Sequence, residues 1–473
     1  MANVKDRLQS FDSATRSLLF ECEITSQEKL NRILNNARKA FDRWADTGLE
    51  SRIRLLHQFA KLLQERQDAF AHWISQESGK LLSDSRGEVT AMMAKVEISI
   101  AAYHERCKIS TYELGSTQSI TRFKPHGVLG VFGPFNFPGH LPNGHIVPAL
   151  LAGNVIVFKP SELTPFTGQK LIELYHEAGF PEDVVQIVQG GPQVGQQLAH
   201  HHEVDGILFT GSAKVGLSIQ EELLKKPGKI LALEMGGNNP LVVSQTTHLD
   251  LAIRHILQSA FQSSGQRCTC ARRLILVENK NTSDLLKQLQ KRIEEITVGP
   301  YTLSPEPFMG PVINQEAANK LLAAQIHLRE RGAQILVQMK QLHPQLPLLS
   351  PAFIDVTQVK EKNDDEFFGP FLQCIQVRTL EEAVQEANKT RYGLIAGLIS
   401  DHLEEYEFFW KHVKAGLINW NTPLTGASSK APFGGIKMSG NFRPGAFFAT
   451  DYCAYPVASM ESTPFAKKEI RPT

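Results

Sequence analysis

Several features that would place a chain in a specialised class are missing from these 473 residues. The 50 lysines and arginines offset 49 acidic residues, so the net charge of +1 gives no electrostatic reason to expect a nucleic-acid or membrane-surface partner. No stretch approaches the ~18 consecutive apolar residues of a membrane-spanning helix. The amino-terminal sequence lacks the apolar segment of a secretion signal, and a cytoplasmic protein is therefore expected.

Cysteine is also scarce, and its spacing argues against a structural metal. The six cysteines are scattered, unlike the dense disulfide framework of a small secreted domain. Cys268 and Cys270 look like one half of a zinc site, but no second Cys/His pair has matching spacing, so no metal is expected. A free thiol such as Cys268 is either activated in an exposed loop or, more commonly, inert and buried.

The pattern of apolar residues predicts an α/β fold in two domains or more. Helices are expected over about 26–108, where apolar residues recur at helical spacing. Beyond residue 128, short apolar runs alternate with helical segments, which predicts βαβ units in a doubly wound parallel sheet. The predicted strands of this series are 128–132, 155–158, 184–188, 206–209 and 230–233, with helices starting at 165 and 213.

The second half repeats the alternation and predicts a second α/β domain over about 235–425. Its predicted helices are 249–262, 281–296 and 403–413, and its predicted strands are 273–277 and 394–399. Residues 110–124 are expected to form a β-hairpin that leaves the first domain, and the tail after Gly445 adds another strand. The predicted architecture is two doubly wound parallel-sheet domains with a small β element.

Two strand ends in the first domain carry residues suited to a ligand, because ligands bind beyond the carboxyl ends of strands in open α/β sheets. Lys159 and Glu162 follow one strand, and a carboxylate there can accept hydrogen bonds from a ribose; a solvated turn with a surface ion pair is the plainer alternative. The second end opens a helix, whose N–H groups and dipole suit a pyrophosphate. It lacks the G-x-G-x-x-G pattern and also fits an ordinary turn; its residues are Gly211, Ser212, Ala213, Lys214, Val215 and Gly216.

Three further segments carry polar or reactive groups. Glu234 ends an apolar strand beside two glycines, which permit close backbone approach and favour a site over a solvated loop acid or an N-cap. Cys268 lies in a loop between a predicted helix and a predicted strand. Asn136 is the centre of a proline-flanked turn and carries an amide able to donate to an oxyanion, although the segment alone is merely a proline-rich turn.

The order and spacing of these segments resemble the aldehyde dehydrogenase superfamily over about residues 26 to 460. The matching segments are Asn136, 159–162, 209–212, 234–237, 265–268, 366–370 and 432–435. The resemblance implies that Cys268 attacks the aldehyde to give a thiohemiacetal, and that the Asn136 amide and the Cys268 N–H stabilise the oxyanion. It implies that Glu234 then activates the water that hydrolyses the thioester.

The resemblance also implies a nicotinamide cofactor and an oligomer. Lys159 and Glu162 would contact the adenosine ribose, residues 211–216 the pyrophosphate and Glu366 the nicotinamide ribose, and Glu162 favours NAD over NADP. A homodimer or homotetramer is expected, with strand exchange through the hairpin and the tail. The implied domains are a Rossmann-like NAD-binding domain (1–109 and 126–234), a catalytic domain (235–425), and an oligomerisation hairpin and arm (110–125 and 440–473).

Several stretches resemble the subfamily that oxidises N-succinylglutamate 5-semialdehyde in bacterial arginine breakdown, namely 135–145, 265–273, 419–421, 425–429, 443–444 and 451–456. Such a substrate carries carboxylates besides the aldehyde, and buried carboxylates favour guanidinium partners. Arg267 and Arg443 are therefore candidate anchors; a structural ion pair for Arg267 and a surface or inter-subunit contact for Arg443 are the alternatives. The remaining candidate substrate residues are Ser428, Ser429, His140 and Asn143.

Other functions remain open at this point. A CoA-acylating dehydrogenase would not need the water-activating carboxylate of Glu234, and a dehydrogenase of a simpler aldehyde would have an apolar pocket. A catalytically silent binding or structural member would be expected to lack Cys268, Glu234 or Asn136, and all three are present. Cys270 is the alternative nucleophile.

Overall fold

The chain begins with a hairpin and four helices in the structure, a computed structural model that describes residues 7–362 and 364–462. The hairpin pairs β1 with β2 in antiparallel orientation. Four helices then cover residues 27–106, as predicted. The elements are β1 (Arg7–Phe11), β2 (Leu18–Glu23), α1 (Gln27–Ala45), α2 (Leu49–Glu65), α3 (Gln67–Ser78) and α4 (Leu82–Arg106).

A five-stranded, fully parallel sheet follows, with the strand order β7-β6-β5-β8-β9. The order reverses between β5 and β8, which is where a ligand crevice opens in sheets of this kind. The strands are β5 (Val128–Phe132), β6 (Val155–Lys159), β7 (Val185–Ile187), β8 (Gly206–Gly211) and β9 (Ile230–Met235). The connecting helices are α5 (His140–Ala152), α6 (Pro165–Glu177), α7 (Pro192–His200) and α8 (Ala213–Leu223).

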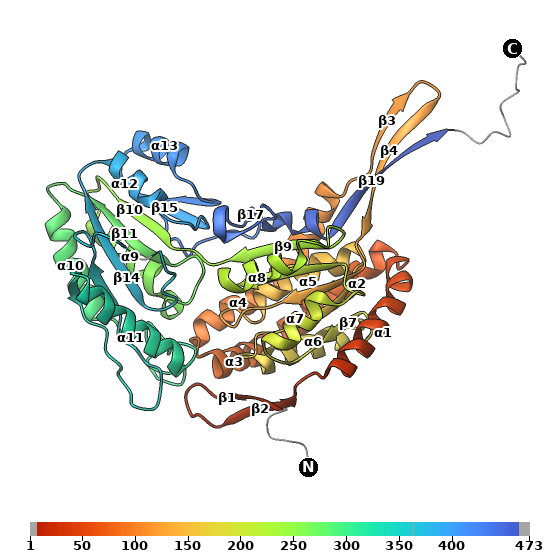
Figure 1. The fold of residues 1–473 in the computed structure, drawn as a ribbon, viewed down its shortest axis with the longest axis horizontal. Coiled ribbons are helices and arrows are strands. Elements are labelled where there is room, and N and C mark those ends of the chain that lie inside the picture. The colour runs from red at the N-terminus through yellow and green to blue at the C-terminus, as the bar shows by residue number, and fades with distance from the viewer. Residues whose placement is uncertain (1–6, 363, 463–473) are drawn as a thin grey trace, which may run out of the picture.

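The second sheet has seven strands in the order β12-β13-β14-β11-β10-β15-β16, and only the edge pair β12–β13 is antiparallel. Its strands are β10 (Asn239–Val243), β11 (Ala271–Val277), β12 (Gln334–Val337), β13 (Ala352–Asp355), β14 (Phe371–Val377), β15 (Ile395–Ile399) and β16 (Leu417–Trp420). Its helices are α9 (Leu249–Phe261), α10 (Thr282–Glu294), α11 (Gln315–Glu330), α12 (Leu380–Asn388) and α13 (Leu403–His412). Figure 1 shows the two sheets side by side.

A small antiparallel sheet, β19-β4-β3, projects from the body of the molecule (Figure 1). It consists of β3 (Ser110–Leu114), β4 (Thr117–Pro125) and β19 (Ala454–Ser462), and β19 pairs with β4 along its whole length. The chain returns to this sheet through β17 (Pro432–Phe433), η3 (Lys437–Ser439), β18 (Gly445–Ala446) and η4 (Phe447–Tyr452). Of the predicted arm 440–473, residues 463–473 lie outside the described residues.

The predicted α/β class, with two doubly wound sheets and a small β element, is confirmed. The main omissions in the sequence prediction lie in the second domain: helix α11 and the strands β10, β12 to β14 and β16. The apolar runs of β12 to β14 are short or interrupted by glutamine. Within the described residues, no helix is long and apolar enough to cross a membrane.

Candidate active site

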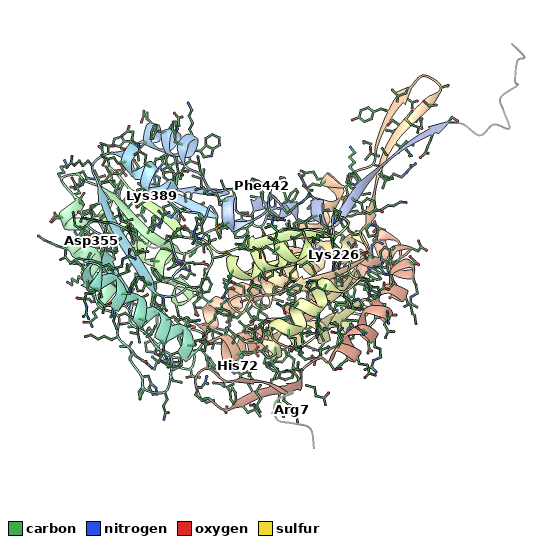
Figure 2. The ribbon with its side chains drawn as sticks, viewed as in Figure 1. Arg7, His72, Lys226, Asp355, Lys389 and Phe442 are labelled. Carbon is green, nitrogen blue, oxygen red and sulfur yellow. The ribbon has the colours of Figure 1, made fainter. Side chains whose placement is uncertain are left out.

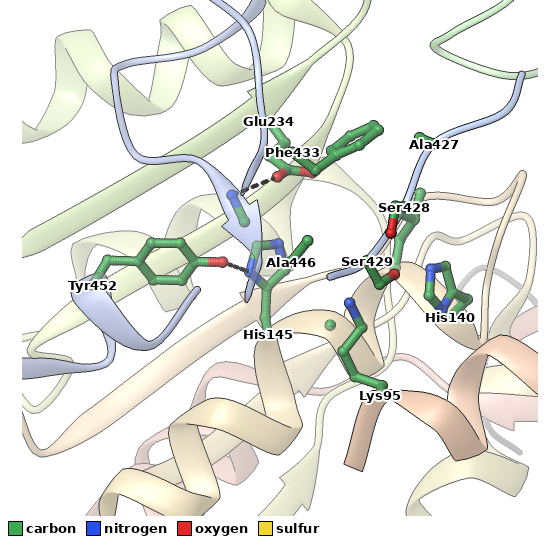
Figure 3. A pocket seen from close by; sticks show the side chains of 13 residues that line it. Lys95, His140, His145, Glu234, Ala427, Ser428, Ser429, Phe433, Ala446 and Tyr452 are labelled. Carbon is green, nitrogen blue, oxygen red and sulfur yellow. Dashed lines mark hydrogen bonds between the residues drawn. The ribbon is translucent and has the colours of Figure 1, made fainter. Parts of the chain in front are cut away.

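Two cavities adjoin beside Glu234. The larger, of about 750 Å³, is lined by the segments that follow β5, β6, β8 and β9 and reaches Cys268. The smaller, of about 100 Å³, lies among α4, α5, η4 and the segment 427–433 (Figure 3). Glu234, Leu141 and Phe433 line both cavities, so a molecule in one can meet a molecule in the other at this carboxylate.

The larger cavity lies at the reversal of strand order between β5 and β8. Most of the residues predicted to bind a cofactor line it: Lys159, Glu162, Gly211, Ser212, Lys214, Val215 and Glu366. Ser212 is the N-cap of α8, and its hydroxyl accepts from the N–H of Val215 at 3.4 Å. Ala213 and Gly216 belong to the same helical turn but do not line the cavity; a side chain at Gly216 would collide with Met235.

The loop that carries Cys268 is held in an unusual backbone conformation by side chains from several elements. Ser263, Ser264 and Gly265 have positive φ angles of 52°, 59° and 68°. A Cβ at Gly265 would lie 2.0 Å from the carbonyl oxygen of Gly369, so only glycine fits there. The fully buried Arg272 donates to the carbonyls of Gly265 and Arg267, at 2.6 and 3.0 Å.

Asn136 and Asn239 fix the two sides of the Cys268 loop. The Asn136 amide donates to the carbonyl of Gln266 at 2.9 Å, which keeps its Nδ2 beside the thiol-bearing segment. Asn239 donates to the carbonyls of Cys268 and Cys270, at 2.6 and 2.9 Å. Within the described residues the Cys268 N–H has no acceptor, so it is free to bind an oxyanion together with Asn136.

Glu234 is a buried carboxyl at the end of β9. Its Oε1 accepts from the N–H of Gly445 at 3.2 Å, and its side chain is only 7% exposed. Burial raises the pKa of Glu234 to about 7, although the Lys95 ammonium and the Gly445 hydrogen bond act in the opposite direction. A carboxyl with this pKa exchanges protons near neutral pH, which suits a general base.

The Cys268 thiol is protonated near neutral pH in this state. Burial raises its pKa to about 12, and the negative charges of Glu234 and Glu366 add to the effect. Glu366 is itself held in place by the N–H of Gly237, at 3.1 Å from its Oε1. An attack by Cys268 therefore needs a base to accept the thiol proton, and Glu234 is the carboxyl that lines both cavities.

Comparison with known proteins identifies the family. The model of the aldehyde dehydrogenase family matches residues 1–454. The chain belongs to the aldehyde dehydrogenase family. It is 47% identical over 454 residues (96% of this chain, 93% of the relative) to an N-succinylglutamate 5-semialdehyde dehydrogenase of Hahella chejuensis (strain KCTC 2396), and 48% identical over 455 residues (96% and 93%) to a protein of the same name from Ectopseudomonas mendocina (strain ymp).

Solved structures of other aldehyde dehydrogenases share the fold. A methylmalonate-semialdehyde dehydrogenase from Oceanimonas doudoroffii is 26% identical and superposes with a TM-score of 0.92, covering 98% of this chain and 96% of that one. Two of the solved structures that share the fold are complexed with NAD or NADP. The larger cavity is chemically suited to a nicotinamide dinucleotide. It offers a helix N-terminus for the phosphates and carboxylates of Glu162 and Glu366 for ribose hydroxyls.

The predicted substrate residues are distributed unevenly in this aldehyde dehydrogenase. His140, Ser428 and Ser429 line the smaller cavity. Asn143 is fully buried and lines neither cavity; its amide donates to the Met92 carbonyl and accepts from the Tyr175 hydroxyl. Arg443 is exposed and outside both linings, next to Phe442, which is 77% exposed (Figure 2).

Arg267 also lines neither cavity and forms an ion pair instead. Its guanidinium lies 3.1 Å from the Asp84 carboxylate of α4, and its Nε donates to the Ser263 hydroxyl. Asp84 accepts from the same hydroxyl at 2.6 Å, so the pair ties α4 to the Cys268 loop. Burial alone would raise the pKa of Asp84, but Arg267 and Lys80 lower it below its ordinary value. This geometry favours the structural alternative for Arg267.

Replacing Asp84 by asparagine is expected to lower the free energy of unfolding by about 3 kcal/mol, because it leaves the Arg267 guanidinium with a buried neutral partner. Chemical denaturation measures this change. Asp68→Asn is the matched control, since Asp68 pairs with Arg86 on the surface, where ion pairs contribute under about 1 kcal/mol. Equal stability of the two variants would show that the Asp84–Arg267 pair does not hold the loop.

The lining residues that the sequence prediction did not name include two from α7 and one from α4. Pro192 and Gly195 of α7 line the larger cavity; Gly190-Gly191-Pro192 is the same kind of strand-to-helix turn as the one at Gly211 and gave the signal. Lys95 lines the smaller cavity from α4. Its signal was a lysine at helical spacing within the buried face of α4, between Met92 and Ser99.

Proposed function

We propose that this aldehyde dehydrogenase oxidises N-succinylglutamate 5-semialdehyde to N-succinylglutamate with NAD, in bacterial arginine degradation by the succinyltransferase pathway. The observation that carries the proposal is the 47–48% identity over 96% of the chain to relatives with that name. The lysine, two histidines and two serines in the lining of the smaller cavity support an anionic substrate. A simple aliphatic aldehyde would favour an apolar lining.

In the proposed mechanism, Cys268 is the nucleophile and Glu234 the base. Glu234 accepts the thiol proton as the sulfur attacks the aldehyde carbon, which gives a thiohemiacetal. The Asn136 amide and the Cys268 N–H donate to the developing oxyanion; removing one such donor costs about 3–4 kcal/mol of transition-state stabilisation in comparable sites. A nicotinamide held in the larger cavity would supply the hydride acceptor. Glu234 gives the thiol proton up to solvent and then removes a proton from water, whose oxygen attacks the thioester. The Cys268 sulfur leaves as the carboxylic acid forms, and it takes this second proton from Glu234 to become a thiol again.

The preference for NAD is proposed to reside in Glu162. This residue follows β6, lines the larger cavity and has its carboxylate 3.8 Å from the Lys159 ammonium. A carboxylate at the adenosine ribose accepts hydrogen bonds from its hydroxyls and repels a 2′-phosphate. Lys159 Nζ also donates to the carbonyl of Pro160 at 2.9 Å, which holds the pair in the turn.

Replacing Glu162 by glutamine is expected to shift the ratio of kcat/KM for NADP over NAD upward by about 10-fold, because it removes the like charge but keeps an acceptor. Steady-state rates with each cofactor at saturating aldehyde measure the ratio. Glu182→Gln, on the turn before β7, is the control and should leave it unchanged. An unchanged ratio in Glu162→Gln would remove Glu162 from the cofactor selectivity.

The substrate is tested by following formation of the reduced cofactor with three aldehydes: N-succinylglutamate 5-semialdehyde, glutamate 5-semialdehyde and a short aliphatic aldehyde. The proposal predicts a clear preference in kcat/KM for the succinylated substrate. Equal or better turnover of either simple aldehyde would contradict the substrate assignment and favour a dehydrogenase of another aldehyde. The family assignment does not depend on this result.

The projecting sheet is proposed to mediate assembly into a homodimer or homotetramer. Its strands expose Tyr112, Leu114 and Met460, which are 54–67% exposed although apolar. Light scattering after size exclusion tests the assembly.

We also propose a division into three parts. Residues 1–109 and 126–234 form the NAD-binding domain, 235–425 the catalytic domain, and 110–125 with 440–473 the oligomerisation hairpin and arm. A cytoplasmic location would keep the Cys268 thiol reduced.

A further inference from the structure

Lys95 is a buried lysine for which no ion pair or hydrogen bond of the ammonium is found among residues 7–362 and 364–462. It lies on the inward face of α4 and lines the smaller cavity. The residue is only 3% exposed. Figure 3 shows the side chain pointing into the space beside Ser429 and His145. A buried ammonium without a counterion is costly, and such groups are normally paired.

A carboxyl and two histidines face Lys95 from two other elements. Glu234 approaches from β9, and His140 and His145 from α5. His145 is fully engaged, with Nδ1 2.9 Å from the Tyr452 hydroxyl and Nε2 2.9 Å from the Thr210 hydroxyl. Burial lowers the pKa of both histidines to about 3, so they are neutral. Lys95 is therefore the cation of this cavity lining.

The cavity also holds polar groups with free hydrogen-bonding capacity. The buried Nδ1 of His140 has no partner within the described residues. The half-buried Ser429 also lines the cavity. Ser428 lies next to it and accepts from the N–H of Lys430. One ammonium, a neutral imidazole and two hydroxyls around a small space form a donor set suited to a carboxylate.

We propose that Lys95, supported by His140 and Ser429, binds the α-carboxylate of the substrate and selects aldehydes that carry an acid group four bonds from the aldehyde carbon. The inference rests on the proposed function and deepens it, because that substrate has one carboxylate on its five-carbon chain and one on the succinyl arm. Glu234 lies where this cavity meets the cavity that contains Cys268, so the binding point is close to the aldehyde. Of the two carboxylates, the α-carboxylate is nearer to the aldehyde, and it is therefore the one that reaches Lys95.

Charge explains why the binding group should be a cation at this position. A substrate carboxylate in the small cavity would be repelled by Glu234, and an ammonium that faces both carboxylates offsets this repulsion. The substrate in turn supplies the counterion that Lys95 lacks. The charge of Lys95 thus acts both on the bound substrate carboxylate and on the catalytic carboxylate of Glu234.

The test uses a matched pair of aldehydes, 5-oxopentanoate and pentanal, which have the same five-carbon chain and differ in a carboxylate against a methyl group. The wild-type ratio of kcat/KM for 5-oxopentanoate over pentanal should fall by about 10- to 100-fold in Lys95→Met, the effect of losing a charged hydrogen bond. Lys95→Arg should retain most of the ratio. Lys320→Met, which removes an exposed lysine of α11, is the control.

A measurement on the wild type keeps the proposal testable if Lys95→Met does not fold. Burial lowers the pKa of Lys95 to about 8, with Glu234 acting in the opposite direction. The same ratio should therefore fall by up to about tenfold per pH unit above about pH 8, as the ammonium loses its proton. Ionisation of Cys268 affects both aldehydes and cancels in the ratio. Ionisation of Glu234 repels only the carboxylate substrate, so a fall of the ratio near pH 7 belongs to Glu234 and the further fall above pH 8 belongs to Lys95.

Equal losses with both aldehydes in Lys95→Met, or a ratio that is flat through pH 8, would overturn the proposal. The first result would mean that Lys95 acts only through the charge of Glu234. These outcomes are separate from a failure of the proposed function. A wild-type enzyme that prefers 5-oxopentanoate to pentanal but does not prefer N-succinylglutamate 5-semialdehyde would keep the Lys95 site and reject the substrate.

Discussion

Cys268→Ala is expected to reduce aldehyde oxidation by at least about 10⁴-fold, because no other group can form the covalent intermediate at that position. Cys268 lines the larger cavity, and its loop is fixed by Asn239, Arg272 and the Asp84–Arg267 pair. The reduction should appear in kcat with every aldehyde. Binding of the nicotinamide cofactor, followed by fluorescence titration, should persist and shows that the variant is folded.

Cys270→Ala is the matched control, two residues away. The Cys270 side chain is fully buried, and the described lining of neither cavity includes it. Alanine there removes a small apolar contact and is expected to cost stability rather than chemistry, so kcat should stay within about threefold of wild type. Activity that survives in Cys268→Ala and is lost in Cys270→Ala would reverse the assignment of the nucleophile.

The elements that carry the cofactor cavity were predictable from local sequence. Strands β5, β6 and β8 are short, continuous apolar runs, because each is buried on both faces of a parallel sheet. Their carboxyl ends must lie at one edge of the sheet. Glu162 follows β6, Ser212 follows β8, and Glu234 lies at the carboxyl end of β9. The three residues therefore line one crevice.

The polar groups that position the site were less predictable, because their partners lie far away in sequence. Arg267 stands beside the nucleophile, yet its partner Asp84 is 183 residues earlier in the chain. Local sequence cannot distinguish such an ion pair from a substrate anchor. For a different reason, Lys95 was not predicted. A lysine on an amphipathic helix is normally on the solvent side, and only its spacing with Met92 and Ser99 placed it inside.

Glu234→Gln is expected to impair both halves of the reaction. Hydrolysis of the thioester needs a base for water, so steady-state turnover should fall by about 10²- to 10⁴-fold. Because Glu234 also accepts the thiol proton in the proposed mechanism, the first turnover should slow as well, and no fast burst of reduced cofactor should precede the slow phase. Stopped-flow absorbance of the reduced cofactor measures the burst, with the exposed Glu316→Gln as the control.

The pH dependence supplies an independent test of the same carboxyl. Burial raises the pKa of Glu234 to about 7, and the base is its ionised form. When hydrolysis limits the wild-type rate, kcat should rise with pH through about 7 and then level off, and this rise should vanish in Glu234→Gln. A burst of about one reduced cofactor per active site in Glu234→Gln would instead show that Glu234 acts only on water and that another base accepts the Cys268 proton. Such a base would be needed because burial raises the pKa of that thiol to about 12.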